Sequence, residues 1–421
     1  MVTAQPGSKS AYLLLSALLI SEALLVAGYG LQLMLLPIRG GIEGFSAVDL
    51  GLLGSSYYLG FVLGCLLTPI LLSRVGHTRT FAALVSITAA VAICYPILVQ
   101  PQFWALLRLF TGICLAGLYL IIESWINDRA TSSTRGTMIS IYVAINYIAT
   151  AAGQMMVTLH DASSFLLFSV ASILISLAVV PLALSRSPAP QPPSLVRVRP
   201  LRLFRLSPAG TVSIFLIGLS NGALWSLGPV LALAKTADLT SAAQFMSVVV
   251  LGGAIAQWPF GKVSDHLDRR HVLMAITLAA TFASVTIALL PQLGGPWLIF
   301  ALLFGATVLP SYAVASAHVF DVADRSEYVQ VSAGLLLLFG VGSTIGPILA
   351  SLGMEWFGPA ALAGFIAVVQ LGIVAFVFIR MRLNKLQVVG EKQAFDLVTA
   401  APMAPAGLGS PQTDAVPVTQ R

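Results

Sequence analysis

Apolar residues in this chain are gathered into twelve long runs, which short polar segments separate. About 20 helical residues cross a hydrocarbon core of roughly 30 Å, so each run is a candidate transmembrane helix. Strand-like alternation is absent, and a helix satisfies its own backbone groups in lipid. The sequence therefore predicts an all-α membrane protein with twelve transmembrane helices. The predicted spans are Ala11–Leu36, Val48–Leu72, Thr80–Val99, Phe103–Trp125, Gly136–Leu159, Ser163–Leu184, Thr211–Ala234, Ser241–Phe260, Val272–Leu290, Trp297–Val319, Val329–Leu352 and Ala360–Ile379.

A polar segment rich in proline and arginine divides the twelve runs into six and six. Proline cannot continue a helix and arginine stays in water, so this segment reads as a linker. The loop SRVGHTR after the second run resembles the loop GKVSDHLDRR after the eighth, which indicates two related halves. We expect an N-terminal bundle over 1–184, a cytoplasmic linker over 185–210, a C-terminal bundle over 211–385 and a disordered cytoplasmic tail over 386–421.

Composition and charge support a lipid-embedded chain. The 421 residues are 57% hydrophobic and 9% charged, whereas a soluble domain is about a quarter charged. With both termini in the cytoplasm, all of the 22 Lys and Arg except Arg39, Arg108 and Lys235 lie on the cytoplasmic side. This is the positive-inside bias of an inner-membrane protein. The net charge of +6 records that topology and gives no sign of nucleic-acid binding.

The loop after the eighth run carries a motif. Gly261, Asp265, Arg269 and Arg270 resemble the signature of the major facilitator superfamily, with Asp268 where that family carries its second glycine. The copy in the first half is degraded, because Ser73 stands in place of the aspartate.

Other segments carry the same resemblance. Arg108 with Gly112 resembles the superfamily's span-four motif, and ESWIND and GVGSTIGP resemble a branch of mostly uncharacterised bacterial inner-membrane transporters. The resemblance covers nearly all of the chain before the tail. It implies two six-helix pseudo-repeats, a small-molecule substrate moved by alternating access, and a monomer without a cofactor or a metal ion.

Three ionisable side chains lie within the predicted spans, namely Glu22, Arg108 and Glu123. Charges in a span are costly, so they face a cavity or a partner. Tyr29 and Gln32 share a helix stripe with Glu22, which favours a cavity-facing acid that binds a proton or a substrate donor. The alternative is a protonated carboxyl bonded to a neighbouring helix. Arg108 either binds an anionic or carbonyl group and assists proton transfer, or pairs with Glu22 or snorkels to the headgroups.

Neutral polar and aromatic residues extend this set of candidates. Tyr119 lies on the Arg108 face of its helix, and Tyr142 and Asn146 share a face of the fifth span. Asn221 and Trp225 are one helical turn apart on the seventh. Each alone fits helix packing as well as ligand contact. Together they favour an uncharged or zwitterionic, partly aromatic solute.

A second group of residues is expected to gate the chamber. Asp265, Arg269 and Arg270 form a local charge set that can bias a two-state equilibrium. Glu123 and His318 lie near the cytoplasmic ends of the fourth and tenth spans. We expect these two to make gate or loop contacts and not to touch the substrate.

These features predict a secondary active transporter of a small organic solute. Proton-linked or facilitated uptake of a nutrient is favoured, and among the family's substrates the aromatic lining suggests an aromatic vitamin such as riboflavin. The alternative is proton-coupled efflux of drugs, sugars or amino-acid derivatives. In the superfamily that the chain resembles, proton-coupled drug antiporters are associated with a Gly-Pro motif in the fifth span, and NYIATAAGQMMV has no proline, which disfavours drug efflux. A non-transporting receptor is more remote. No nucleophile constellation, metal-ligand cluster or phosphate-binding glycine loop is evident, so no enzymatic activity is expected.

Overall fold

The structure, a computed structural model, describes residues 8–129, 135–184, 200–236, 238–290 and 296–383. Within these ranges the chain is helical and contains no strand. Twelve helical spans among the described residues are long and apolar enough to cross a membrane. The predicted all-α fold and its twelve spans are therefore confirmed. The predicted tail over 386–421 and the linker residues 185–199 lie outside the described residues.

The helices follow the predicted runs in order. The first half contains α1 (Ser8–Ile42), α2 (Ala47–Val75), α3 (His77–Cys94), α4 (Pro101–Arg129), α5 (Arg135–Met155), the 3₁₀ turn η1 (Met156–Leu159), α6 (Leu166–Leu177) and α7 (Val179–Leu184). The second half contains α8 (Pro200–Leu206), α9 (Pro208–Thr236), α10 (Leu239–His266), α11 (Arg269–Leu289), α12 (Trp297–Val308), α13 (Ser311–Phe320), the turn η2 (Arg325–Glu327), α14 (Tyr328–Phe357) and α15 (Ala361–Leu383). Helices α6 and α7 make one span, and α12 and α13 make another.

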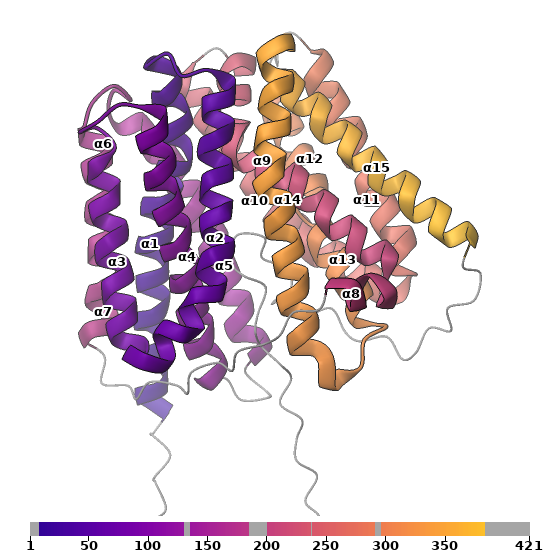
Figure 1. Cartoon of the computed structure of the whole chain (residues 1–421), viewed down its shortest axis with the longest axis horizontal. Coiled ribbons are helices and arrows are strands. Elements are labelled where there is room, and N and C mark those ends of the chain that lie inside the picture. Colours follow the sequence, from indigo (N-terminus) through magenta and orange to yellow (C-terminus); the bar gives the residue numbers. More distant parts are fainter. Residues whose placement is uncertain (1–7, 130–134, 185–199, 237, 291–295, 384–421) are drawn as a thin grey trace, which may run out of the picture.

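The two halves form two bundles that lie side by side, with α1–α7 on the left of Figure 1 and α8–α15 on the right. Helix α2 packs against α14 and α9, and α5 packs against α10, so these helices form the boundary between the bundles. We call the end that carries the α1–α2 connection the first-loop end and the end that carries α8 the linker end.

Close glycine contacts hold matching helix pairs together in the two bundles. Gly112 on α4 lies against the backbone of Tyr57 on α2, and Gly305 on α12 lies against the backbone of Val249 on α10. A methyl group at either glycine would overlap the opposing backbone. The hydrophobic effect does not drive helices together in lipid, so close van der Waals packing, which small residues allow, holds them together. The second and fourth spans of each half are therefore packed in the same way.

Several helix ends differ from those predicted. Helix α1 continues through Pro37 to Ile42, so Arg39 lies in its last turn and not beyond the span. Helix α9 extends to Thr236 and includes Lys235. Part of the predicted linker, residues 200–206, forms the short helix α8, and α9 begins at Pro208. Proline is accepted in the first turn of a helix because its missing N–H would have no partner there.

Contacts between the bundles close the first-loop end. The backbone N–H of Ala47, at the start of α2, donates to Glu355 Oε2 near the end of α14 at 3.2 Å. Ser247 Oγ on α10 donates to the carbonyl of Ala151 on α5 at 3.0 Å. Both contacts lie in the half of the molecule toward the first-loop end. Further in, Tyr147 donates its hydroxyl to Gln257 Oε1 at 2.8 Å.

Candidate functional site

A buried guanidinium group lies on a cluster of tyrosine rings. Arg108 on α4 is only 5% exposed, and its Cζ lies 4.4 Å from the ring centroid of Tyr57 on α2 and 6.0 Å from that of Tyr29 on α1. The two rings are stacked on each other with centroids 5.4 Å apart. Cation–π attraction of this kind stabilises a cation that has left water. The α1–α4 packing thus holds one positive charge inside the first bundle.

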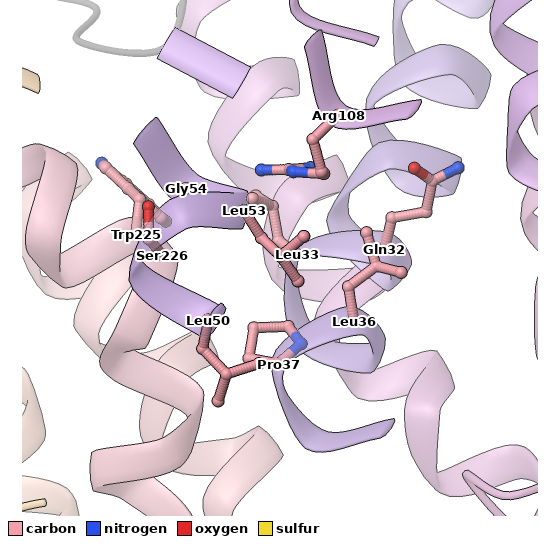
Figure 2. A pocket seen from close by; sticks show the side chains of 10 residues that line it. All are labelled: Gln32, Leu33, Leu36, Pro37, Leu50, Leu53, Gly54, Arg108, Trp225 and Ser226. Carbon is pink, nitrogen blue, oxygen red and sulfur yellow. The ribbon is translucent and has the colours of Figure 1, made fainter. Parts of the chain in front are cut away.

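A pocket joins this arginine to the second bundle. Arg108, Gln32 on α1, and Trp225 and Ser226 on α9 contribute to its lining. Leu33, Leu36, Pro37, Leu50, Leu53 and Gly54 complete the wall. Figure 2 shows the Arg108 guanidinium directed between Gln32 on one side and Trp225 with Ser226 on the other. Residues from four helices and both halves therefore meet at one place.

The polar atoms of this pocket lack partners. No hydrogen bond is made by Arg108 Nη1, the side-chain amide of Gln32, Trp225 Nε1 or Ser226 Oγ among the residues the structure describes. The side-chain amide of Asn221, one turn from Trp225 on α9, is also buried and unpaired within the same ranges. Buried polar groups usually have a partner, and each unsatisfied one costs free energy. Such a concentration indicates a site that a polar ligand completes.

Glu22 lies in a second polar layer, away from Arg108. Its side chain has no exposed area, and its Oε1 accepts a hydrogen bond of 2.8 Å from Nδ2 of Asn146 on α5. Its Oε2 has no partner among the described residues. Gln32, at the level of Arg108, is ten residues further along α1, which corresponds to about 15 Å. The pairing of Arg108 with Glu22 that the sequence left open is not formed here.

Tyrosines and a second acid surround Glu22. Tyr119 on α4 and Tyr142 on α5 are buried, and both interact electrostatically with Glu22. Glu123, one turn beyond Tyr119 on α4, is half-buried and also interacts with Glu22 and Tyr142. The structure therefore places Glu123 with the Glu22 layer and not with the charge set of the second half.

The gating candidates of the second half form an ionic network at the linker end. Arg269 Nε lies 2.6 Å from Asp321 Oδ2 after α13, and its Nη2 lies 3.3 Å from Asp265 Oδ1 on α10. Its Nη1 donates to Ser264 Oγ at 3.0 Å. His318 is buried and lies near enough to interact electrostatically with this network. Arg269 thereby links the ends of α10, α11 and α13.

Asp268 and Arg270 form a separate pair. Arg270 Nη2 lies 2.8 Å from Asp268 Oδ2, and Asp268 Oδ1 accepts from the backbone N–H of Arg270 at 2.9 Å as the N-cap of α11. Burial alone would raise the pKa of Asp268, but the hydrogen bonds and charge of Arg270 outweigh it and hold this pKa below its usual value. The aspartate that replaces a family glycine therefore starts a helix.

Some residues of the site were not predicted from the sequence. Tyr57 and Ser226 were not singled out, although the run SSYYLGF places Tyr57 in the middle of an apolar helix. Asp321 was not singled out either. These residues carry no charge or lie at a helix end, so only their packing against Arg108, Gly54 or Arg269 reveals their place. No group of three or more His, Cys, Asp or Glu that could hold a metal ion occurs among the described residues.

Comparison with known proteins finds relatives in sequence and in fold. YcaD of Escherichia coli (strain K12 / DH10B), an uncharacterised MFS-type transporter, is 27% identical over 377 residues, which cover 88% of this chain and 94% of YcaD. The crystal structure of the nucleoside transporter NupG is similar with a TM-score of 0.75 at 15% identity, covering 89% of this chain and all of NupG. The fucose:proton symporter FucP of E. coli gives 0.57 at 15% identity, covering 88% and 99%.

The family profile matches both halves separately. Residues 18–210 and 210–408 each match the profile of the Major Facilitator Superfamily. The two matches meet at the start of the second bundle, as expected of two six-helix repeats in one transporter. The predicted family is confirmed: this twelve-span membrane protein belongs to the Major Facilitator Superfamily.

Proposed function

We propose that this chain is a proton-linked secondary transporter that takes up a small organic nutrient by alternating access, with Glu22 as the proton-carrying group. The observation that carries the proposal is a carboxyl group with no exposed area and no basic partner among the described residues. An ionised carboxylate without a counter-charge is costly in this environment. The protonated form of Glu22 is therefore favoured, and release of the proton requires a change in its surroundings.

The surroundings of Glu22 offer a route for that proton. Glu123 interacts with Glu22 and is half-buried, and it lies closer to the linker end of α4. Tyr119 and Tyr142 stand beside both acids and interact electrostatically with each of them. Under the proposed topology the linker end faces the cytoplasm. A proton held on Glu22 would then leave toward the cytoplasm by way of Glu123.

The boundary between the bundles supports alternating access. The first-loop end is joined across the halves by Ala47 with Glu355 and by Ser247 with Ala151. These contacts are few, and each breaks if the bundles rock apart. With both termini in the cytoplasm, this end faces the outside, and the structure represents a state closed to the outside. The pocket at Arg108 lies just beneath that closure.

The substrate class proposed from the lining is a partly aromatic solute, with an aromatic vitamin such as riboflavin as one candidate. The Trp225 indole lines the pocket, and the stacked rings of Tyr29 and Tyr57 lie against Arg108, which also lines it. Aromatic side chains of this kind pack against planar groups.

Proton movement coupled to the solute tests the proposal. A growth screen of a deletion strain on single nutrients and inhibitors would supply the solute. Purified protein in weakly buffered liposomes should then make the external medium alkaline when the solute is added, because protons enter with it. The variant Glu22→Gln should abolish this signal. Glu43→Gln, a matched change beyond the end of α1 where Glu43 pairs with Arg39, should retain it.

The sign of the pH change separates the alternatives. Acidification of the medium during solute entry would indicate exchange of solute for protons and would favour the efflux alternative. Solute entry without any pH change would contradict proton coupling. A normal signal in Glu22→Gln would show that another group carries the proton.

A further inference from the structure

Arg108 differs from the other cations buried in the spans because its Nη1 has no acceptor and no described carboxylate pairs with it; its neighbours are the side chains of Tyr29 and Tyr57. Arg269 is held by Asp321 and Asp265, and Lys235 donates to the carbonyls of Ala288 and Leu290. Arg108 makes no ion pair with any described carboxylate, and its Nη1 makes no hydrogen bond there. A buried guanidinium is rarely left without an anion. The lack of an anionic partner at Arg108 therefore indicates that a ligand supplies one.

The pocket around Arg108 offers mainly donors. Arg108 and the Trp225 indole donate and cannot accept, and Arg108 Nη1 and Trp225 Nε1 have no acceptor among the described residues. Gln32 and Ser226 can do both, and their side-chain groups are also unpaired among the described residues. The lining contains no Asp or Glu. The group that satisfies this pocket must supply several acceptor atoms and negative charge, and must fit the fork of a guanidinium.

We infer that the pocket between the bundles binds the carboxylate of a small organic anion at Arg108, so that the transported solute is a planar or aromatic monocarboxylate. This inference rests on the proposed transport function and narrows its substrate class to carboxylates, which excludes riboflavin. A carboxylate accepts two parallel hydrogen bonds from arginine, which is the strongest pairing available to this side chain. Trp225 and Ser226 bring the second bundle to the same ligand, and the leucines of the lining face its apolar part.

The separation of Arg108 from Glu22 also fits this inference. The two groups occupy separate layers of the first bundle: Arg108 lies beside Tyr29 and Gln32, which are seven and ten residues beyond Glu22 on α1, or about 10 to 15 Å along the helix. One layer can therefore hold an anion while the other holds a proton. A monoanion that moves with one proton carries no net charge across the membrane. Uptake by this route does not respond to the membrane potential, whereas it does respond to a pH gradient.

Matched probes test the charge of the ligand. Benzoate and trans-cinnamate would be compared with benzamide, cinnamamide, benzylamine and riboflavin by thermal unfolding of the purified full chain. The carboxylates should raise the unfolding temperature, and the neutral and cationic probes should not. A hydrogen-bonded charge pair corresponds to about a tenfold or larger effect on affinity. Arg108→Gln should weaken carboxylate binding by at least that factor.

Two further variants keep the test decisive. Arg108→Lys retains a positive charge in the span and loses the fork, so it should bind the carboxylates more weakly than wild type and more strongly than Arg108→Gln. Lys235→Gln changes a buried cation on α9, the helix that carries Trp225 and Ser226; the partners of Lys235 are carbonyls of α11 and the residue after it. It should keep the wild-type preference for carboxylates.

Stabilisation by riboflavin or by the amides equal to that by the carboxylates would overturn the inference, as would a panel in which no carboxylate stabilises the protein. The proposed function fails by a different result. Proton-coupled transport of a neutral solute would contradict the anion site at Arg108 and would agree with the proposed transport function. Tight carboxylate binding with no proton movement would contradict the proton coupling and leave the site intact.

Discussion

Closure of the first-loop end depends on a glycine that faces the second bundle. A Cβ atom at Gly54 on α2 would overlap the Ser226 side chain on α9 and lie 3.2 Å from Pro347 Cβ on α14. Both contacts are between the halves, so rocking the bundles apart relieves them. The substitution Gly54→Ala should therefore shift the protein toward a state open at the first-loop end.

The magnitude follows from the cost of overpacking. An extra methyl group in a tightly packed contact costs about 1–3 kcal/mol. Because about 1.4 kcal/mol changes an equilibrium tenfold, the ratio of closed to open molecules should fall by about 5- to 150-fold. Replacing a helical glycine by alanine also stabilises the helix by about 1 kcal/mol. That term is the same in both conformations and leaves the ratio unchanged.

Distance measurements between spin labels report this ratio directly. Ile42 at the end of α1 and Phe357 at the end of α14 are both exposed and lie at the first-loop end in different halves. Labels would be attached at cysteines placed there, after Cys65, Cys94 and Cys114 are replaced by alanine. Gly54→Ala should move population from the short distance to a longer one. A matched control is Gly364→Ala on α15, where an added Cβ meets nothing within 4 Å.

Identical distance distributions in wild type and Gly54→Ala would refute the reasoning. An equal shift in Gly364→Ala would refute it as well, because the effect would then come from helix stability and not from contact between the halves.

Three further predictions concern stability. Asp268→Ala should lower the free energy of unfolding by about 1 kcal/mol, because α11 loses its N-cap. The pKa of Asp268 is lowered in the folded state, so the stabilisation from its charge is complete above about pH 4 and is lost as the pH falls through that lowered pKa. Thermal unfolding measured across this pH range checks both effects. Arg269→Gln should cost about 3 kcal/mol, because it leaves Asp321 without its cation, and Arg269→Lys should recover part of it in the same assay. Gly153→Ala should lower the yield of monodisperse protein, because its Cβ would overlap the carbonyl of Ala27 on α1.

The number of spans could be predicted because bilayer thickness fixes the length of an apolar run. Helix ends could not be predicted equally well. The first span was predicted to end at Leu36, but α1 continues through Pro37 to Ile42, and Gly40 in its last turn packs closely against Leu50 and Phe45. Local propensity gave way to tertiary contact there, as it commonly does near proline in membrane helices.

The charged residues of the site were predicted from the sequence, but the residues that contact them were not. Glu22 and Arg108 were evident because ionisable residues are rare in apolar runs. Their surroundings were not evident, because the stripe that joins Glu22 to Gln32 spans two layers, with Asn146 in one and Tyr57 in the other. Which neutral polar residue meets which charge depends on helix rotation and depth, and hydropathy determines neither.

The central claim is that Glu22 couples a proton to the solute. Measuring gradient-driven accumulation and solute exchange side by side in liposomes, for wild type and Glu22→Gln, tests it most directly. Glu22→Gln should exchange labelled for unlabelled solute at a rate near that of wild type, because the pocket at Arg108 is intact, and should fail to accumulate solute against its gradient. Accumulation by Glu22→Gln equal to that of wild type would contradict the account.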